Sequence, residues 1–239
     1  MMRYFLQTII GFLLVAIQSA LFASAIAVNP LAVDLNVQNR YQDIQVHNVG
    51  NSTAYVKIEV ERIDHPGQPD QTFTELNDNP YQIGLIVTPS KVVIPVGQTR
   101  IMRALYVGSP PTSDVIYRIT IAPVSGDLIA MYSGQTKLSA GMQLIIAYGV
   151  TIYARPLILE PHITAVRKGT ALSLTNTGNT SVLIASCKQC NAKNICLPVP
   201  SVAKRLYPGN HFEATLPEDA PLQCTEGVLQ DQFVPFNVQ

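Results

Sequence analysis

The sequence predicts an all-β protein of two β-sandwich domains joined by a short hinge. Short segments that alternate apolar and polar residues recur with turn residues between them, and helical periodicity is scarce after residue 25. Two such series are separated by Arg155-Pro156. Because proline cannot continue a central strand ladder, this dipeptide is the best candidate for the hinge. We therefore expect the two domains at residues 26–156 and 157–239.

The strongest strand signals lie in the first domain. Asp43–Asn48 and Tyr55–Glu61 alternate, so each is expected to have one buried and one solvated face. The longest predicted strand is Gln143–Ala154, which is rich in β-branched and aromatic residues and follows a predicted long loop at Ser125–Gly141. Further strands are predicted at Ala32–Val37, Val92–Ile94, Ile101–Val107, Ile116–Ile121, Leu172–Asn176, Val182–Ala185 and Phe233–Val238.

The first 25 residues have the organisation of a cleavable signal peptide. One basic residue, Arg3, precedes the apolar run Ile9–Phe22, and Ala23-Ser24-Ala25 follows. The alternative is a membrane anchor, for which this run is short. We expect cleavage after Ala25 and export from a bacterial cell. No later segment approaches the ~20 apolar residues of a spanning helix, so stable membrane insertion is not expected.

All four cysteines lie in the last third of the chain, at Cys187, Cys190, Cys196 and Cys224. In an exported protein an even number of cysteines indicates disulfides. The alternative is zinc, because Cys187 and Cys190 have C-x-x-C spacing, but Cys196 and Cys224 form no second knuckle. Of the three possible connectivities we favour Cys187–Cys196, which would close a hairpin loop, with Cys190–Cys224.

The composition and motifs favour a binding protein over an enzyme. Basic and acidic side chains number 16 each, so a nucleic acid is not an expected partner. Charged residues make up 13% of the chain, about half the usual fraction, which suggests apolar surface kept for a partner. The chain contains no recognised catalytic or phosphate-binding motif, and its four histidines are scattered. We therefore expect no catalytic residues, cofactor or metal.

Several short stretches occur in an order that is found in one family. They are Thr88-Pro89 with Val92–Gly97 and Arg100–Arg103, then Tyr117–Ile119, Ala154–Pro156, Leu172–Asn179 before the cysteine loop, and Phe233–Pro235. In this order the chain resembles the periplasmic chaperones of the chaperone–usher pilus pathway, which have two immunoglobulin-like domains set at an angle. The second-domain stretches are most similar to the alternate, common-pilus type.

The resemblance implies a function and a binding strand. Such a chaperone donates an edge strand to a pilus subunit, which stabilises it, and delivers the subunit to an outer-membrane usher. The strand aligned with the donor is Gln143–Thr151, and its expected subunit-facing side chains are Met142, Leu144, Ile146, Tyr148 and Val150. The other face is also largely apolar, so parity alone does not choose between the two; it presents Gln143, Ile145, Ala147, Gly149 and Thr151. Alignment of the linker favours Met142, Leu144 and Ile146 as the groove-filling residues. The alternative is an ordinary strand buried on both faces, which periodicity alone does not exclude.

The chain departs from the better-known members at the site that holds the subunit's terminal carboxylate. The two basic residues of those chaperones align with Leu31 and Thr151. Arg118, Arg103 and Arg155 are candidate substitutes, and Arg155 is an equally good candidate to stabilise the hinge. Two other functions stay open: a structural pilus subunit or adhesin with two immunoglobulin-like domains, and an exported β-sandwich enzyme.

Overall fold

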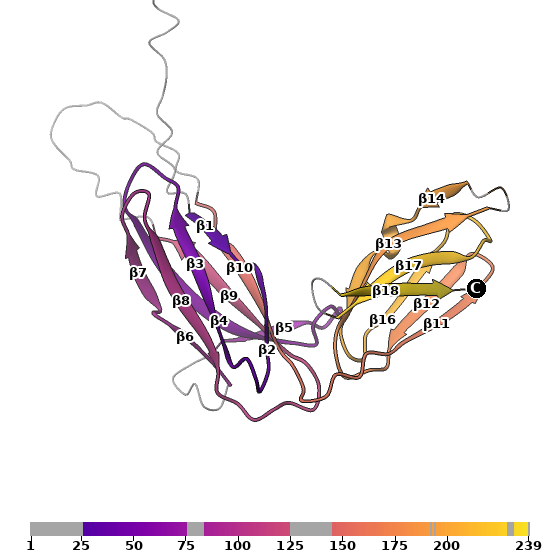
Figure 1. Ribbon diagram of the computed structural model, residues 1–239, viewed down its shortest axis with the longest axis horizontal. Helices are drawn as coiled ribbons and strands as arrows, with labels where there is room; N and C mark the ends of the chain where they lie inside the picture. The colour runs from indigo at the N-terminus through magenta and orange to yellow at the C-terminus, as the bar shows by residue number, and fades with distance from the viewer. Residues whose placement is uncertain are drawn as a thin grey trace, which may run out of the picture.

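The computed structural model describes residues 26–75, 84–124, 145–191, 193, 195–228 and 232–238. Figure 1 shows two β-sandwiches set at an angle, with the chain passing once between them. The regular secondary structure of the described residues is all strand apart from the 3-10 turn Pro200–Val202. The prediction of two immunoglobulin-like β-sandwiches is confirmed. The predicted signal peptide and the Ser125–Gly141 loop lie outside the described residues.

The first sandwich contains two sheets whose strands all come from residues 26–154. One sheet has the order β1 (Ile26–Asn29), β3 (Tyr41–Asn48), β8 (Thr99–Tyr106) and β6 (Leu85–Thr88). The other has the order β2 (Ala32–Leu35), β10 (Tyr148–Ala154), β9 (Val115–Pro123), β4 (Ala54–Asp64) and β5 (Thr72–Glu75), with β7 (Lys91–Ile94) also on β4.

The apolar positions of the alternating strands form the core between these sheets. Ile44 and Met102 from one sheet, and Ile119 and Ile152 from the other, are all 0% exposed. Their polar neighbours along each strand point to the outer faces, because successive side chains of a strand alternate sides. The core therefore accounts for the alternation that the sequence shows.

The second sandwich is built from strands within residues 163–238. Its smaller sheet has the order β11 (Ile163–Lys168), β12 (Ala171–Asn176) and β16 (His211–Thr215). Its larger sheet has the order β14 (Cys196–Pro198), β13 (Val182–Cys190), β17 (Leu222–Gly227) and β18 (Phe233–Val238), with β15 (Lys204–Leu206) also on β13. Leu174 and Ile184, both 0% exposed, lie in the core between them.

A buried asparagine closes an equivalent turn in each sandwich. Asn48 ends β3 and donates to the carbonyls of Ser52 and Ile94, each at 2.8 Å. Asn176 ends β12 and donates to the carbonyls of Thr180 and Leu206, also at 2.8 Å. Both side chains are 0% exposed, and an amide without partners there would be costly. Each domain thus uses the same pattern of side-chain hydrogen bonds from a buried asparagine to stabilise a turn at the end of a strand.

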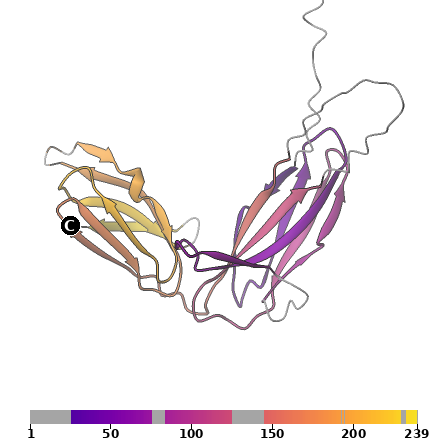
Figure 2. The same ribbon diagram turned by 180° about the vertical axis from the view of Figure 1, so that it is seen from behind.

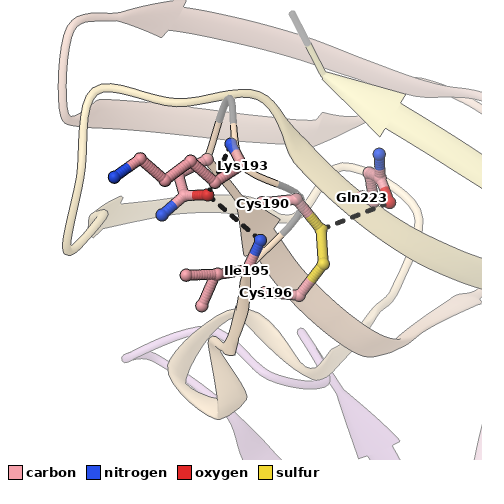
Figure 3. The surroundings of a disulfide bond; sticks show 6 residues. Cys190, Lys193, Ile195, Cys196 and Gln223 are labelled. Atoms are coloured by element: carbon pink, nitrogen blue, oxygen red, sulfur yellow. Dashed lines mark hydrogen bonds between the residues drawn. A yellow bond between two sulfur atoms is a disulfide. The ribbon is translucent and has the colours of Figure 1, made fainter.

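The disulfides differ from the pairing that the sequence suggested. The bonds join Cys187 to Cys224 and Cys190 to Cys196, so the predicted Cys187–Cys196 and Cys190–Cys224 pairs are wrong. The register explains why, since Cys190 lies directly opposite Cys196 across the β13–β14 hairpin. Figure 3 shows this outer disulfide at the hairpin, with Gln223 beside it.

A bulge in β13 determines the other pair. Between Ala185 and Lys188 the register with β17 shifts, and Ser186 has a positive φ of 50°. The extra residue turns Cys187 toward the core, where it meets Cys224, and each is 5% exposed. Cys190, three positions further along β13, lies on the opposite face.

The two disulfides are expected to differ in their contribution to stability. The Cys187–Cys224 bond spans 37 residues and the Cys190–Cys196 bond spans 6. Loop-closure entropy predicts losses of about 4 and about 2 kcal/mol on their removal. Urea unfolding of a Cys187→Ala/Cys224→Ala variant and of a Cys190→Ala/Cys196→Ala variant measures both. An equal or larger loss for the outer pair would contradict this assignment.

Candidate functional site

Strand β10 has a free edge over the last part of the predicted donor strand. It pairs with β9 along its whole length, from Tyr148 opposite Ile121 to Ala154 opposite Val115. On its other side β2 pairs only with residues 151–154. Among the described residues, no strand covers that side of residues 148–150. The chain therefore presents a strand edge that an extended peptide could extend.

The hydrogen-bonding direction along this edge can be assigned. The Thr151 N–H donates to the Leu31 carbonyl at 3.0 Å, and the Arg155 N–H donates to the Leu35 carbonyl at 2.8 Å. Odd-numbered residues of β10 therefore direct their backbone groups to the β2 side. By the same alternation, the N–H and C=O of Gly149 point to the free side.

Side chains of even number on β10 face the core of the first sandwich. Val150 and Ile152 are 0% exposed. Tyr148 is half-buried and packs against the core, whereas Ile146 is 53% exposed. The expectation that Val150 faces a subunit is wrong, because this domain's own core buries it. Ile146 is the first residue on this face that the free chain leaves uncovered.

The predicted donor strand is longer than the strand in the structure. β10 begins at Tyr148. Residues 145–147 are described, but they do not belong to a strand. Met142 and Leu144 lie outside the described residues. That these two residues face a bound subunit therefore stays a prediction.

The opposite face of this sheet points toward the second sandwich. Tyr153 lies on it, is 7% exposed, and has the guanidinium carbons of Arg155 and Arg205 at 4.5 and 5.0 Å from its ring centroid. Two residues along β10, Thr151 lies on the same face, opposite Arg118 of β9. Arg118 is in turn opposite Glu61 of β4. Thr151, Arg118 and Glu61 thus form a row of side chains across three strands. This row lies on the face of the sheet that points into the space between the domains.

Arg118 is the candidate arginine with a partly exposed side chain on the β10 sheet. Its Nε lies 3.5 Å from a Glu61 carboxylate oxygen, and its side chain is 38% exposed. That Nε is buried and has no hydrogen-bond partner in the described structure. The guanidinium carbon lies 3.9 Å from the centroid of the Phe73 ring of β5. A Cβ on Gly149 would lie 3.6 Å from Arg118 Cδ, so Arg118 lies between β10 and β5.

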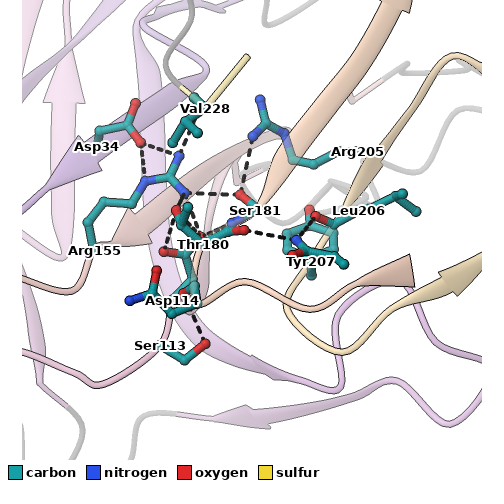
Figure 4. A network of polar contacts seen from close by, with 12 residues as sticks. Asp34, Ser113, Asp114, Arg155, Thr180, Ser181, Arg205, Leu206, Tyr207 and Val228 are labelled. Atoms are coloured by element: carbon teal, nitrogen blue, oxygen red, sulfur yellow. Dashed lines mark hydrogen bonds and ion pairs between the residues drawn. The ribbon is translucent and has the colours of Figure 1, made fainter. Parts of the chain in front are cut away.

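Arg155 instead lies in a buried polar network between the domains (Figure 4). Its Nε donates to Asp34 at 2.7 Å, and its Nη1 pairs with Asp114. Nη1 also donates to Thr180 at 2.9 Å and to Ser181 at 3.0 Å. The Arg155 side chain is 2% exposed and that of Asp114 is 0% exposed. These partners, which no local sequence signal indicated, leave Arg155 unavailable to a ligand.

Arg103 lies away from β10, on the other sheet of the first sandwich. It makes a two-pronged contact with Asp43, at 2.7 and 2.9 Å, and stacks on Tyr41 at 4.4 Å. The hydrogen bond from Arg103 lowers the pKa of Asp43 below its usual value. Arg103 is therefore a surface ion pair remote from the free strand edge.

A second contact between the domains is made by the hairpin that joins β4 to β5. Figure 2 shows this hairpin reaching from the first sandwich to the second. Asn210 Nδ2 donates to the Pro66 carbonyl at 3.0 Å, and Gln68 Nε2 donates to the Gly209 carbonyl at 3.4 Å. Tyr207 lies beside this contact, and burial raises its pKa to about 12.

The comparisons with known proteins agree with this architecture. No family model matches the sequence. Two curated fimbrial subunits of Escherichia coli are similar. The one from CS1 fimbriae is 25% identical over 80% of this chain and 75% of its own, and the one from CFA/I fimbriae is 24% identical over 77% of each. The solved class 5 fimbriae chaperone CfaA has a TM-score of 0.64 and 21% identity, covering 90% of this chain and 99% of its own.

Two further structures extend the likeness. The E. coli chaperone DraB has a TM-score of 0.63 and 16% identity over 91% of this chain and 97% of its own. A complex of the Salmonella enterica SafA pilin with the SafB chaperone matches with a TM-score of 0.63 and 14% identity, over 90% of this chain and 95% of the matched one. The chain has the fold of the fimbrial chaperones.

Two other kinds of site find no support in the described residues. These residues bring no three His, Cys, Asp or Glu side chains into a group that could hold a metal ion. Within the same residues, no helix is long and apolar enough to cross a membrane. The free edge of β10 and the exposed face that carries Arg118 remain as candidate binding features of the described residues.

Proposed function

We propose that this chain is a periplasmic chaperone that lends the free edge of β10 to a fimbrial subunit. The observation that carries the proposal is the unpaired side of residues 148–150, next to the exposed Ile146. A fold shared with fimbrial chaperones supports it. The proposal includes delivery of the subunit to an outer-membrane usher.

The binding chemistry follows from strand pairing. A subunit that lacks one strand has an open groove and unpaired backbone groups, which promote aggregation. In the proposed complex β10 is extended upstream, its backbone pairs with the subunit, and alternate side chains fill the groove. Ile146, Leu144 and Met142 are the proposed groove-filling side chains, because they share the parity of the core-facing side of β10.

Arg118 is our proposed anchor for the subunit's terminal carboxylate. It faces the space between the domains and lies directly across from Thr151. Its side chain is 38% exposed, so the accessible part of the guanidinium could donate charge-assisted hydrogen bonds to a carboxylate. Arg118 also has a carboxylate neighbour, Glu61, but its Nε makes no hydrogen bond to it. Arg103 instead makes two hydrogen bonds to Asp43 on the other sheet, and Arg155 is paired with two carboxylates.

The proposed processing and domain limits accompany this function. Residues 1–25 would direct export and be removed, leaving a mature chain from Ile26. The boundary between residues 26–156 and 157–239 is proposed from the sheets, since β10 ends at Ala154 and β11 begins at Ile163.

The alternative of a structural subunit has one argument in its favour, because both curated relatives are named fimbrial subunits. A subunit of this kind would be an incomplete sandwich with an open core. In the described structure both cores are enclosed by strands of this chain, with Ile119 and Leu174 each 0% exposed. We therefore favour the chaperone.

Co-expression with a fimbrial subunit encoded beside this chain tests the proposal. We expect the tagged chain to retain the subunit from a periplasmic extract in a complex of one copy each. The same subunit expressed without this chain should aggregate or be degraded. Recovery of this chain within a surface fibre, rather than in that complex, would instead identify it as a subunit.

A further inference from the structure

Strand β5 is an unusual partner for a binding-site arginine. All four of its residues, Thr72–Glu75, are exposed, so it is not held by a core of its own. Phe73 is itself 41% exposed. The centroid of its ring lies 3.9 Å from the guanidinium carbon of Arg118. An exposed aromatic on an exposed strand contributes little to folding. Its contact with a single cation therefore calls for another explanation.

The ring restricts where Arg118 can point. A guanidinium stacked on an aromatic face keeps its N–H groups in the plane parallel to the ring. Glu61 lies at one edge of that plane, at 3.5 Å from Nε. Gly149 has no side chain to occupy the space beside Arg118 Cδ. The cation is thus held in one orientation between β10 and β5 without being fully neutralised.

The hairpin that carries Phe73 is itself attached to the second domain. Its tip at Gly67 has a φ of 74°, and a Cβ there would lie 2.8 Å from Asn210 Oδ1. Glycine is therefore required at Gly67 both by the backbone and by the close approach. Asn210 and Gln68 complete the attachment by the hydrogen bonds described above. The position of Phe73 depends on contacts from both domains.

We propose that Phe73 is a positioning residue that orients the Arg118 guanidinium toward the carboxylate of a bound subunit. The inference rests on the proposed function and deepens it. Phe73 itself need not touch the subunit, since it acts on the arginine. Without the ring, Arg118 can turn fully onto Glu61 or into solvent, and the carboxylate must reorder it on binding.

The test is a competition in one periplasm, in which two tagged forms of the chain compete for the same subunit. Phe73→Ala is expected to lower the captured share about tenfold relative to wild type, as loss of a well-oriented charged hydrogen bond would. Phe73→Tyr and Phe73→Trp keep a flat ring and should retain capture within about threefold. Tyr55→Ala is the matched control, because Tyr55 is also an exposed aromatic on β4 of the same sheet, 57% exposed.

A double variant separates orientation from simple contact. In an Arg118→Ala background, Phe73→Ala should cause no further loss. An equal further loss in that background, or full capture by Phe73→Ala, overturns the proposal. The free chain supplies an independent measurement, since the Arg118 Nε–H signal in NMR should be sharp in wild type and lost in Phe73→Ala. This signal is informative even if the chain captures no subunit, which would refute the proposed function alone.

Discussion

Replacing Arg155 with alanine is expected to lower the free energy of unfolding by about 3–5 kcal/mol, the usual cost of leaving a buried charge unpaired. The substitution leaves the fully buried Asp114 carboxylate without its cation, and Asp34 also loses its partner. Asp114 would retain only the Thr180 hydroxyl and the Ser181 N–H. Urea unfolding followed by circular dichroism measures the loss.

Matched variants make this expectation specific. Arg103→Ala removes an exposed ion pair and should lower the unfolding midpoint far less than Arg155→Ala does. Arg155→Lys keeps the charge but lacks the forked geometry that reaches both carboxylates, so it should fall between the wild type and Arg155→Ala. If Arg155→Ala unfolds at the same urea concentration as Arg103→Ala, the network is not a stabilising connection between the domains.

Replacing Ile146 with aspartate is expected to reduce the amount of subunit complex at least about hundredfold, because a carboxylate would have to enter an apolar groove. The folded chain should tolerate the change, since Ile146 is 53% exposed. A second variant that adds Leu144→Asp should abolish the complex. Capture of the subunit from periplasmic extract, with the unfolding midpoint as the check on folding, measures both effects.

The adjacent residue provides the control. Ile145 is also exposed, at 41%, but its odd number places it on the other face of the proposed strand extension. Ile145→Asp should therefore reduce capture only about threefold, as rim contacts do. A loss equal to that of Ile146→Asp would show that the parity of the donated face is wrong, or that this segment binds in another conformation.

Strands with strong alternation are predictable from the sequence, because burial of one face requires an apolar residue at every second position. Asp43–Asn48 and Tyr55–Glu61 lie within β3 and β4. β5 was missed, since its residues are all exposed and carry no signal of a buried face. β1 was missed because Ile26–Asn29 was interpreted as the start of the mature chain.

Contacts between distant segments were the least predictable. The bulge at Ser186 reverses the facing of β13 and so changes the partner of Cys187. Nothing local to the cysteines indicates that change. Likewise, the network of Arg155 joins residues up to 121 positions apart, whose proximity only the folded chain determines. The same holds for Phe73 and Arg118, which belong to strands that are not adjacent in the sheet.

The central claim, that this chain lends the free edge of β10 to a subunit, is tested most directly by amide hydrogen exchange resolved by residue. In the free chain the Gly149 N–H should exchange rapidly, because it points to the uncovered side, and the Ile152 N–H should exchange slowly. In the subunit complex Gly149 and Ala147 should become protected by about 100-fold or more, as core strand amides are. Unchanged exchange at both residues in a complex that has formed would contradict donation of this edge.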